Sequence, residues 1–384
     1  MEHDRTRPDA GSPVATRFGK TKTNAFQGGV AMKRISIGML VLSACFVLVA
    51  RVQTQEAHTI TKFNVAGAGN GKGQGTIPGG IVADGSILGL YIDSSNVYHG
   101  FLRNPTTGHI TKINFPGSEA TFAEGMNSAL AIVGYYLDTN GAAHGFLRSP
   151  GGKYTSLNAP GAGTGSGQGT IAADINTTGE IAGSYSDSNG VYHTFFRTPK
   201  GKFTKFDAPG AGTGSGQGTF VAGFSGLTDA GAIAGNYTDS GGVSHGFLLS
   251  SGQFTGPIDP TGSVNTFVIG LSSKNMVAGI YYLSTGYFHG FVRTIDGTIT
   301  SFDATNAVAT TANNIDPAGA IAGAYYDSSF VERGYVRSPD GKHFTEFNVS
   351  GAGQGTSANS SNSAGTITGN YVDSNGVNHG YIRQ

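Results

Sequence analysis

From residue 59 onward, hydrophobic positions come in short runs that are separated by polar and glycine-containing breaks. One stretch shows the pattern clearly, with the runs TIAADIN (170–176), EIAGSYS (180–186), VYHTFFR (191–197) and KFTKFDA (202–208) following one another. The breaks between them are Thr-Thr-Gly, Asp-Ser-Asn-Gly and Thr-Pro-Lys-Gly, and each favours a tight reversal of the chain. The pattern predicts four short β-strands joined by turns. Helix is disfavoured after residue 58, because Gly or Pro interrupts almost every stretch of about ten residues.

The same four-strand unit recurs along the chain. Each copy carries a His-Gly-Phe-like element in its third run, and the seven copies lie 44 to 52 residues apart. These elements begin at His99, His144, His193, His245, His289, Arg333 and His379. Four strands in a repeat of about 45 residues are typical of a β-propeller blade, and propellers have about four to eight blades. The repeat therefore predicts an all-β fold, a seven-bladed β-propeller of four-stranded blades.

The two ends of the repeat region complement each other. The last unit ends at HGYIRQ (379–384) without a fourth strand, whereas TITKFNV (59–65) resembles a fourth strand and opens the region. We therefore expect residues 58–384 to form a single propeller whose last blade is closed by the N-terminal strand, which leaves no inner strand edge free. An open β-solenoid is the alternative fold.

Two recurring residue types are expected to be structural. The Phe or Tyr after each His-Gly pair should form core between blades, and the glycine of each IAGSY-type run should let neighbouring sheets approach closely.

The N-terminal region differs from the repeats. Residues 1–31 are polar and patternless, and we interpret them as a leader from a misassigned start at Met32. Residues 32–57 carry Lys33 and Arg34 before an apolar run, which is typical of a signal peptide. Cys45, the only cysteine, follows Leu-Ser-Ala as in a lipobox, so a lipidated Cys45 or a retained signal anchor are the alternatives that would attach the chain to a membrane. We expect a secreted or periplasmic bacterial protein.

The bulk composition narrows the choice of partners. The formal net charge is zero and charged residues make up 12% of the chain, so no electrostatic footprint for nucleic acid or anionic membranes is present. The 63 glycines sit at fixed offsets among 39 Phe and Tyr residues (23 Phe and 16 Tyr), which favours a turn-rich β fold over disorder. We expect a monomer.

An aspartate precedes the turn between the second and third strands in six units. These residues are Asp93, Asp138, Asp187, Asp239, Asp327 and Asp373. Each is expected to cap its own turn. Calcium is the alternative ligand, although the later ligands of a calcium loop are missing, and no other cofactor or metal is expected. The repeat histidines are expected to make structural hydrogen bonds, because copies related by seven-fold rotation lie too far apart to share a metal.

Glycine-rich linkers join a fourth strand to the next first strand, as in PGAGTGSGQGT (160–170). A strand follows them rather than a helix, so they do not match a phosphate-binding loop. In a four-stranded meander these linkers and the Asp-bearing turns emerge on one side, which we call the Asp face. The opposite face should carry Arg103, Arg148, Arg197, Arg293 and Arg337. Because propeller ligands commonly bind at loops or at the channel mouth, the Asp face is the predicted ligand-binding face.

The pattern Y-x-D-S-N-G-V-x-H-G-F-x-R, with F-x-x-x-D-x-P-G from Phe203 to Gly210, resembles the bacterial HAF family of extracellular repeats. The resemblance extends over residues 59–384, with Gly in place of the middle Ala of the His-Ala-Phe signature. It implies an exported repeat protein and brings no catalytic residues with it.

Two functions compete. The first is a binding or surface-interaction module for a glycan or a cell-envelope protein. The alternative is an extracellular polysaccharide lyase or glycosidase, which needs paired acid and base groups near the propeller axis. A catalytic site should also interrupt the repeat, and the units depart from the common pattern at Glu119, Glu124, Asp174 and Glu332-Arg333. Glu124 and Asp174 fall in predicted innermost strands, so they are the catalytic candidates.

Overall fold

The computed structural model describes residues 58–384. The predicted leader, the predicted signal peptide and Cys45 lie outside the described residues. The described part contains 28 β-strands. None of its elements is a helix long and apolar enough to cross a membrane.

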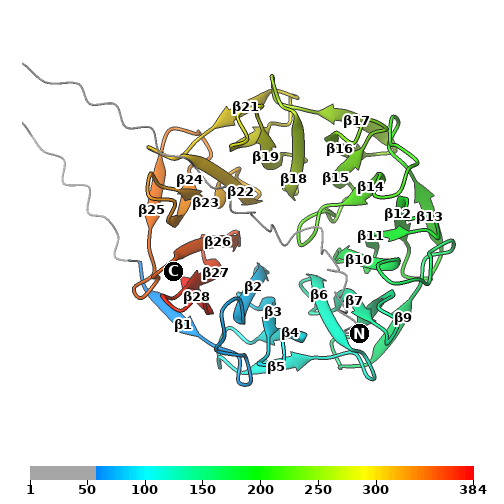
Figure 1. Cartoon of the computed structure of the whole chain (residues 1–384), viewed down its shortest axis with the longest axis horizontal. Coiled ribbons are helices and arrows are strands. Elements are labelled where there is room, and N and C mark those ends of the chain that lie inside the picture. Colours follow the sequence, from blue (N-terminus) through cyan, green and yellow to red (C-terminus); the bar gives the residue numbers. More distant parts are fainter. Residues whose placement is uncertain (1–57) are drawn as a thin grey trace, which may run out of the picture. The chain divides into compact units, whose positions relative to one another are not determined.

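The strands form seven groups of four, arranged in a ring and numbered here as blades 1 to 7 in chain order (Figure 1). Blade 1 consists of β2 (Gly75–Ile81), β3 (Ile87–Ile92), β4 (Tyr98–Arg103) and β5 (Ile110–Ile113), and blade 2 consists of β6 (Ala120–Met126), β7 (Ile132–Leu137), β8 (Ala143–Arg148) and β9 (Tyr154–Leu157). Blade 3 consists of β10 (Gly169–Ile175), β11 (Ile181–Ser186), β12 (Tyr192–Arg197) and β13 (Phe203–Phe206), and blade 4 consists of β14 (Gly218–Val221), β15 (Ile233–Thr238), β16 (Ser244–Ser250) and β17 (Gln253–Ile258). Blade 5 consists of β18 (Asn265–Leu271), β19 (Val277–Tyr282), β20 (Phe288–Arg293) and β21 (Ile299–Phe302), and blade 6 consists of β22 (Ala309–Ile315), β23 (Ile321–Tyr326), β24 (Glu332–Arg337) and β25 (Phe344–Phe347). Blade 7 consists of β26 (Gly355–Ser361), β27 (Ile367–Val372), β28 (Asn378–Arg383) and β1 (Ile60–Phe63).

Neighbouring strands within a blade pair antiparallel, as the tight turns predict. Four pairs of adjacent blades are joined by a parallel bridge between the start of a third strand and the start of the next first strand. Examples are Tyr192 with Gly218 and Glu332 with Gly355. The first strand of each blade lies innermost in the ring and the fourth strand lies outermost (Figure 1).

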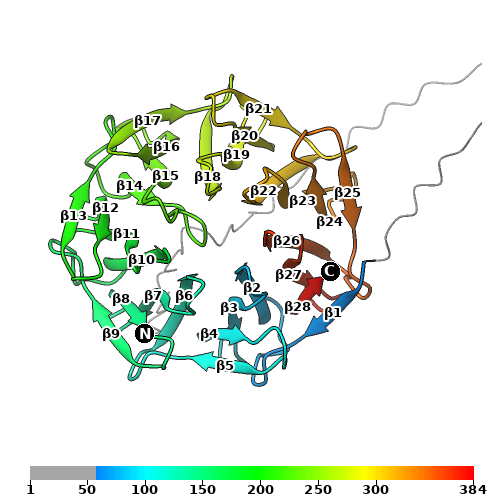
Figure 2. The ribbon, with the colours of Figure 1, turned by 180° about the vertical axis from the view of Figure 1, so that it is seen from behind.

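The first strand of the described chain belongs to the last blade. β1 pairs antiparallel with β28, with Ile60 opposite Arg383 and Phe63 opposite Gly380. Thr59 and Gln384 exchange backbone hydrogen bonds of 2.9 and 3.0 Å. In both ring views the blue β1 lies beside the red β28 (Figure 1, Figure 2). The predicted pairing of residues 59–65 with the C-terminal tail is confirmed.

The recurring aromatic residue forms the centre of each blade's packing. Its seven copies are at most 1% exposed: Phe101, Phe146, Phe195, Phe247, Phe291, Tyr335 and Tyr381. The glycine on the neighbouring second strand makes room for this ring, because a Cβ at Gly183 would collide with Phe195. The same holds for Gly89 with Phe101. The expectation that these glycines serve contact between neighbouring sheets is therefore corrected, since most of them seat an aromatic ring of their own blade.

Candidate functional site

The Asp-bearing turns fold around their own carboxylates. Asp187 Oδ1 accepts hydrogen bonds from the backbone N–H groups of Asn189 (2.8 Å) and Val191 (2.9 Å). The same pair of bonds is made by Asp93, Asp138, Asp239, Asp327 and Asp373. An oxygen that accepts two amide protons holds the turn in one conformation, so the predicted capping role is confirmed.

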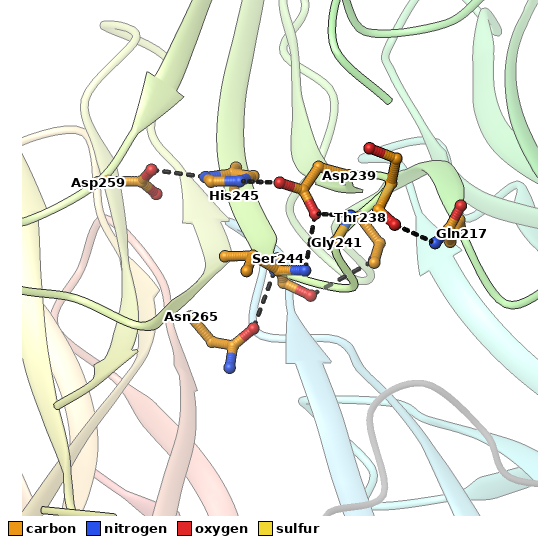
Figure 3. Close-up of polar contacts among 10 residues, drawn as sticks. Gln217, Thr238, Asp239, Gly241, Ser244, His245, Asp259 and Asn265 are labelled. Atoms are coloured by element: carbon orange, nitrogen blue, oxygen red, sulfur yellow. Dashed lines mark hydrogen bonds and ion pairs between the residues drawn. The ribbon is translucent and has the colours of Figure 1, made fainter. Parts of the chain in front are cut away.

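The second oxygen of these carboxylates faces the repeat histidine. His144 Nε2 lies 3.0 Å from Asp138 Oδ2, and its Nδ1 lies 3.2 Å from Asn158 Oδ1. Figure 3 shows His245 in the same position between Asp239 and Asp259. A tyrosine from the second strand stacks on the ring, as Tyr136 does on His144 at 5.1 Å between centroids. The predicted structural hydrogen bonding of the histidines is confirmed.

These contacts lower the pKa of all six turn carboxyls. In Asp93, Asp187, Asp239, Asp327 and Asp373 the largest cause is the backbone N–H four residues on, and in Asp138 it is the hydrogen bond with His144. Blade 6 keeps the arrangement with Arg333, whose Nη2 lies 2.7 Å from Asp327 Oδ2. Blade 5 has Leu283 in place of the aspartate. Both oxygens of each carboxylate thus have partners within their own blade, and ligand binding by the six aspartates stays a prediction.

The glycine-rich linkers are packed on the same face as these turns. Gln168 Nε2 donates to Ser188 O (3.0 Å), and its Oε1 accepts from Gly165 N (3.0 Å). Gly167 N donates to Gly141 O in the turn of the preceding blade at 3.0 Å. The predicted shared surface is therefore present, and the linker is a close-packed connector.

Four of the five predicted arginines lie over aromatic rings: Arg103, Arg148, Arg197 and Arg337. Arg337 lies 4.6 Å from the Phe302 ring centroid in the preceding blade, and Arg103 lies 5.1 Å from that of Phe63. Desolvation lowers the pKa of both guanidinium groups. These residues contribute to packing between blades as well as carrying charge.

The innermost strands depart from the repeat near the axis. Six of them contain a register shift immediately after their fourth residue, and in blade 2 the residue inserted at the shift is Glu124. The corresponding residues of blades 6 and 7 are Asn313 and Asn359, and each donates to a carbonyl of the next blade, Ala358 O (3.0 Å) and Pro78 O (2.7 Å). Within residues 58–384, Glu124 has no such partner.

Glu124 is surrounded by protein but keeps limited contact with solvent. Its desolvation raises the pKa of the carboxyl to about 7. Its Oε2 would lie 3.5 Å from a Cβ built on Gly223 of blade 4. Because it lacks a partner and is partly protonated near neutral pH, Glu124 has the environment expected of a titrating channel residue.

Asp174, the other catalytic candidate, is tied to the backbone. It is 6% exposed, and its two oxygens accept from Ile175 N (2.8 Å) and Leu227 N (3.1 Å). Desolvation raises its pKa to about 7, while these N–H groups oppose the shift. The bond to Leu227 attaches Asp174 to blade 4, so the geometry supports an anchoring role. Joint acid–base catalysis by Glu124 and Asp174 stays a prediction.

Residues 222–227 of blade 4, called here the central loop, replace the register shift of the other innermost strands. Figure 1 shows the chain between β14 and β15 reaching toward the middle of the ring. Phe224 packs against Gly79 and Gly80 of blade 1, where a Cβ at position 79 would collide with its ring. Ser225 O accepts from Leu271 N of blade 5 (3.0 Å), and Ser225 Oγ accepts from Asn314 Nδ2 of blade 6 (3.3 Å). The loop is thereby attached to several blades across the ring.

A cavity of about 270 Å³ lies between the central loop and the first-to-second turns. Its lining is rich in serine and asparagine, and includes Ser225, Ser272, Asn314, Ser360 and Asn362 together with Phe224, Leu271 and Met126. Asp316 is the one charged side chain among the described residues that line it. The cavity opens on the face opposite the Asp face, because it is built from the other set of turns.

Sequence reasoning missed the central loop and this cavity. The spacing of the repeat histidines carried a signal for the central loop. His193 and His245 lie 52 residues apart, whereas His144 and His193 lie 49 apart, although both intervals contain a long linker. The difference of three residues lies between the first and second strands of blade 4. For metals, residues 58–384 contain no group of three or more His, Cys, Asp or Glu arranged to hold an ion.

No protein-family model matches the chain, and no curated protein matches it. Among solved structures, the chain is similar to the β-propeller domain of the Trilobed protease from Pyrococcus furiosus, described as having an open velcro topology. The two share 6% identity over 80% of this chain and 97% of that chain, with a TM-score of 0.50. A puromycin hydrolase gives 11% identity over 77% of this chain and 50% of its own, with a TM-score of 0.50.

A lectin from Aleuria aurantia in complex with alpha-methyl-L-fucoside gives 13% identity over 75% of this chain and 97% of its own, with a TM-score of 0.40. The two likenesses with a TM-score of 0.50 show a fold and not an activity. The protein is an all-β propeller.

Proposed function

We propose that this protein is an exported propeller that acts as a binding or surface-interaction module, with a neutral glycan as its ligand class. The observation that carries the proposal is the polar cavity at the place where the repeat is broken, in which Asp316 is the one charged side chain among the described lining residues. The repeated Asp, His and Tyr side chains make contacts that hold each blade together. The residues near the axis that depart from the repeat are therefore the ones available to bind a ligand. Propeller ligands commonly bind at such mouths.

The polarity of the cavity supports a neutral ligand. Serine and asparagine side chains supply donors and acceptors without a net charge, and Phe224, Leu271 and Met126 supply apolar surface. This combination suits a sugar, which presents hydroxyl groups and apolar C–H groups on one ring. The similarity of the repeat to HAF-family sequences supports export, and the neutral composition supports a partner that is neither nucleic acid nor an anionic membrane.

The alternative, a polysaccharide lyase or glycosidase, would use Glu124 as an acid, since its pKa of about 7 keeps it partly protonated at neutral pH. That function requires a second group free to act with it. Asp174 has both oxygens engaged with backbone N–H groups, which favours binding over turnover.

A glycan array probed with the purified protein, with and without calcium, tests the proposal. We expect binding to one or more neutral glycans that does not depend on calcium, and no release of reducing ends or unsaturated products from the same polysaccharides. An array without binding, combined with polysaccharide turnover that Glu124→Gln abolishes, would overturn the proposal in favour of the enzyme.

A further inference from the structure

We propose that the cavity beside the central loop binds the terminal ring of a neutral glycan, an inference that rests on the proposed function and names its site. The volume of about 270 Å³ lies just below the range of roughly 300–1,000 Å³ that drug-sized ligands occupy, so it suits about one sugar ring. The cavity ends at the central loop, which is bonded to blades 3, 5 and 6 through Leu227 and Ser225. Phe224 and Ser225 of this loop form one wall of the cavity, and a wall at that place favours the end of a chain over an internal segment.

The lining offers hydroxyl hydrogens for a ligand. Ser272 Oγ accepts from Met276 N (3.1 Å), Ser360 Oγ accepts from Ile81 N (3.4 Å), and Ser225 Oγ accepts from Asn314 Nδ2. Within residues 58–384, the hydroxyl hydrogens of these three serines have no acceptor of their own. A serine hydroxyl can donate one bond while it accepts others. Ser225 is half-buried and is the most accessible of the three donors, whereas Ser272 and Ser360 are 2% and 6% exposed.

The distribution of charge selects between sugars. The lining contains the Asp316 carboxylate and no lysine or arginine. Asp316 Oδ1 is occupied by the N–H groups of its own turn, from Ala318 to Ala320. An anionic sugar would bring a second carboxylate into the site without a cation to pair with it, so uronic and sialic acids are disfavoured.

The position of Phe224 fits a binding role. Its φ of 58° lies in the left-handed region, where a bulky side chain is strained, and such residues are concentrated at ligand sites. The hydrogen bonds of the adjacent Ser225 and the glycines of blade 1 hold the residue in place, and Phe224 is half-buried. The ring can therefore provide an apolar surface for the C–H face of a sugar.

Two exposed turn residues allow a matched test. Ser363 lies in the Asn-Ser-Ala turn of blade 7 at the rim of the cavity, and Ser128 lies in the Asn-Ser-Ala turn of blade 2 outside the lining. Both follow an asparagine that caps the turn, Asn362 and Asn127. Ser363→Trp should block the cavity, whereas Ser128→Trp places the same bulk on an equivalent turn away from it.

The experiment is saturation-transfer NMR and calorimetry on the protein and both variants, with methyl glycosides of neutral hexoses and pentoses and with methyl glucuronide. We expect binding of a neutral glycoside, a loss of affinity of at least about tenfold for Ser363→Trp and a change within about twofold for Ser128→Trp. Methyl glucuronide should bind at least about tenfold more weakly than the matching neutral glycoside.

Failure of this inference differs from failure of the proposed function. If the array detects glycans but Ser363→Trp binds them as tightly as Ser128→Trp, the cavity is not the site, although the protein is still a binding module. Equal or tighter binding of the glucuronide would overturn the neutral selectivity. Absence of binding by the unsubstituted protein, both on the array and to the methyl glycosides, would remove the proposed function itself.

Discussion

At the scale of single residues, the repeated polar side chains form a hydrogen-bonded chain within their own blade, which blade 3 shows in full. Asp187 holds its turn through two backbone N–H groups, and His193 lies 3.5 Å from Asp187 and 3.0 Å from Asp207, which follows the fourth strand. The ring of Tyr185 packs on the histidine. This hydrogen-bonded chain joins the second, third and fourth strands at their Asp-face ends. The recurring Asp, His and Tyr residues of the sequence therefore have a structural role.

Asp187→Ala removes the acceptor of both turn N–H groups and the partner of His193. We expect a loss in the free energy of unfolding of about 1–2 kcal/mol, as for other capping residues, measured by urea denaturation. Asp187→Asn keeps one side-chain oxygen for the turn and should lose less than half as much. An alanine variant as stable as the unsubstituted protein would show that the turn does not depend on this carboxylate.

Gly79 seats the Phe224 ring of the central loop. Gly79→Ala should displace that ring and destabilise the protein by about 1–3 kcal/mol, because the added methyl group has no space. Gly151→Ala is the matched control, since a Cβ there would meet nothing closer than 4.0 Å, and its stability should change by less than about 0.5 kcal/mol. Thermal denaturation of both variants is the measurement. Equal stability of the two would contradict the seating of Phe224 against blade 1.

At the scale of elements, the fourth strand of blade 7 is supplied from the other end of the chain. β1 and β13 have nearly the same sequence, Ile-Thr-Lys-Phe and Phe-Thr-Lys-Phe, and both lie at the outer edge of a blade. β13 is connected to its blade by a short turn, whereas β1 has no turn to β28 and is held in blade 7 by strand pairing and side-chain contacts. The same strand therefore has a different mechanical role in the two places.

Proline at equivalent positions separates these roles. In β1, Thr61 lies opposite Ile382, two residues beyond the hydrogen-bonded pair of Thr59 and Gln384, so the Thr61 amide also faces the partner strand. In β13, Thr204 occupies the equivalent position opposite Phe196. Proline removes the amide hydrogen in either strand. We expect Thr61→Pro to lower the melting temperature by more than Thr204→Pro and to increase proteolysis at both chain ends. A smaller effect of Thr61→Pro than of Thr204→Pro would show that β1 does not hold the ring together.

The strands themselves were predictable because each repeats a local pattern. The expected run at 191–197 becomes β12 at Tyr192–Arg197, and the run at 202–208 becomes β13 at Phe203–Phe206. The central loop could not be predicted, because the three extra residues of blade 4 do not encode the direction in which the chain leaves the sheet. The partner of Asp174 could not be predicted either, because Leu227 lies 53 residues away in the sequence and meets it only once blades 3 and 4 are packed.

At the scale of the whole molecule, two sets of carboxyl groups act on stability in opposite directions. The six turn aspartates have a lowered pKa in the folded state, so they stabilise it above their unfolded pKa of about 4, and that contribution is lost as the pH falls through the folded pKa. Glu124 and Asp174 have a folded pKa raised to about 7, so their contribution becomes less favourable as the pH rises from about 4 to about 7. The free energy of unfolding should therefore be greatest at mildly acidic pH.

Glu124→Gln tests the predicted loss of folding stability as the pH rises toward 8. The variant removes a carboxylate that is costly to ionise, so at pH 8 it should be more stable than the unsubstituted protein by about 1–3 kcal/mol, less where channel water reaches the group. At pH 4 the difference should nearly vanish, because the glutamate is then protonated in the folded state. Urea denaturation at both pH values measures it. A variant that is less stable at pH 8 would mean that Glu124 has a stabilising partner when ionised.

In this protein the repeated residues build the scaffold, and the proposed ligand binds where the repeat is broken. Hydrogen exchange followed by mass spectrometry, with and without the methyl glycoside that binds most tightly, distinguishes this site from the Asp face. We predict slower exchange in the central loop (222–227) and in the rim segments 271–273 and 360–363, with the Asp-bearing turns unchanged. Protection confined to the turns that follow Asp93, Asp138 and Asp187 would place the ligand on the Asp face and contradict the account.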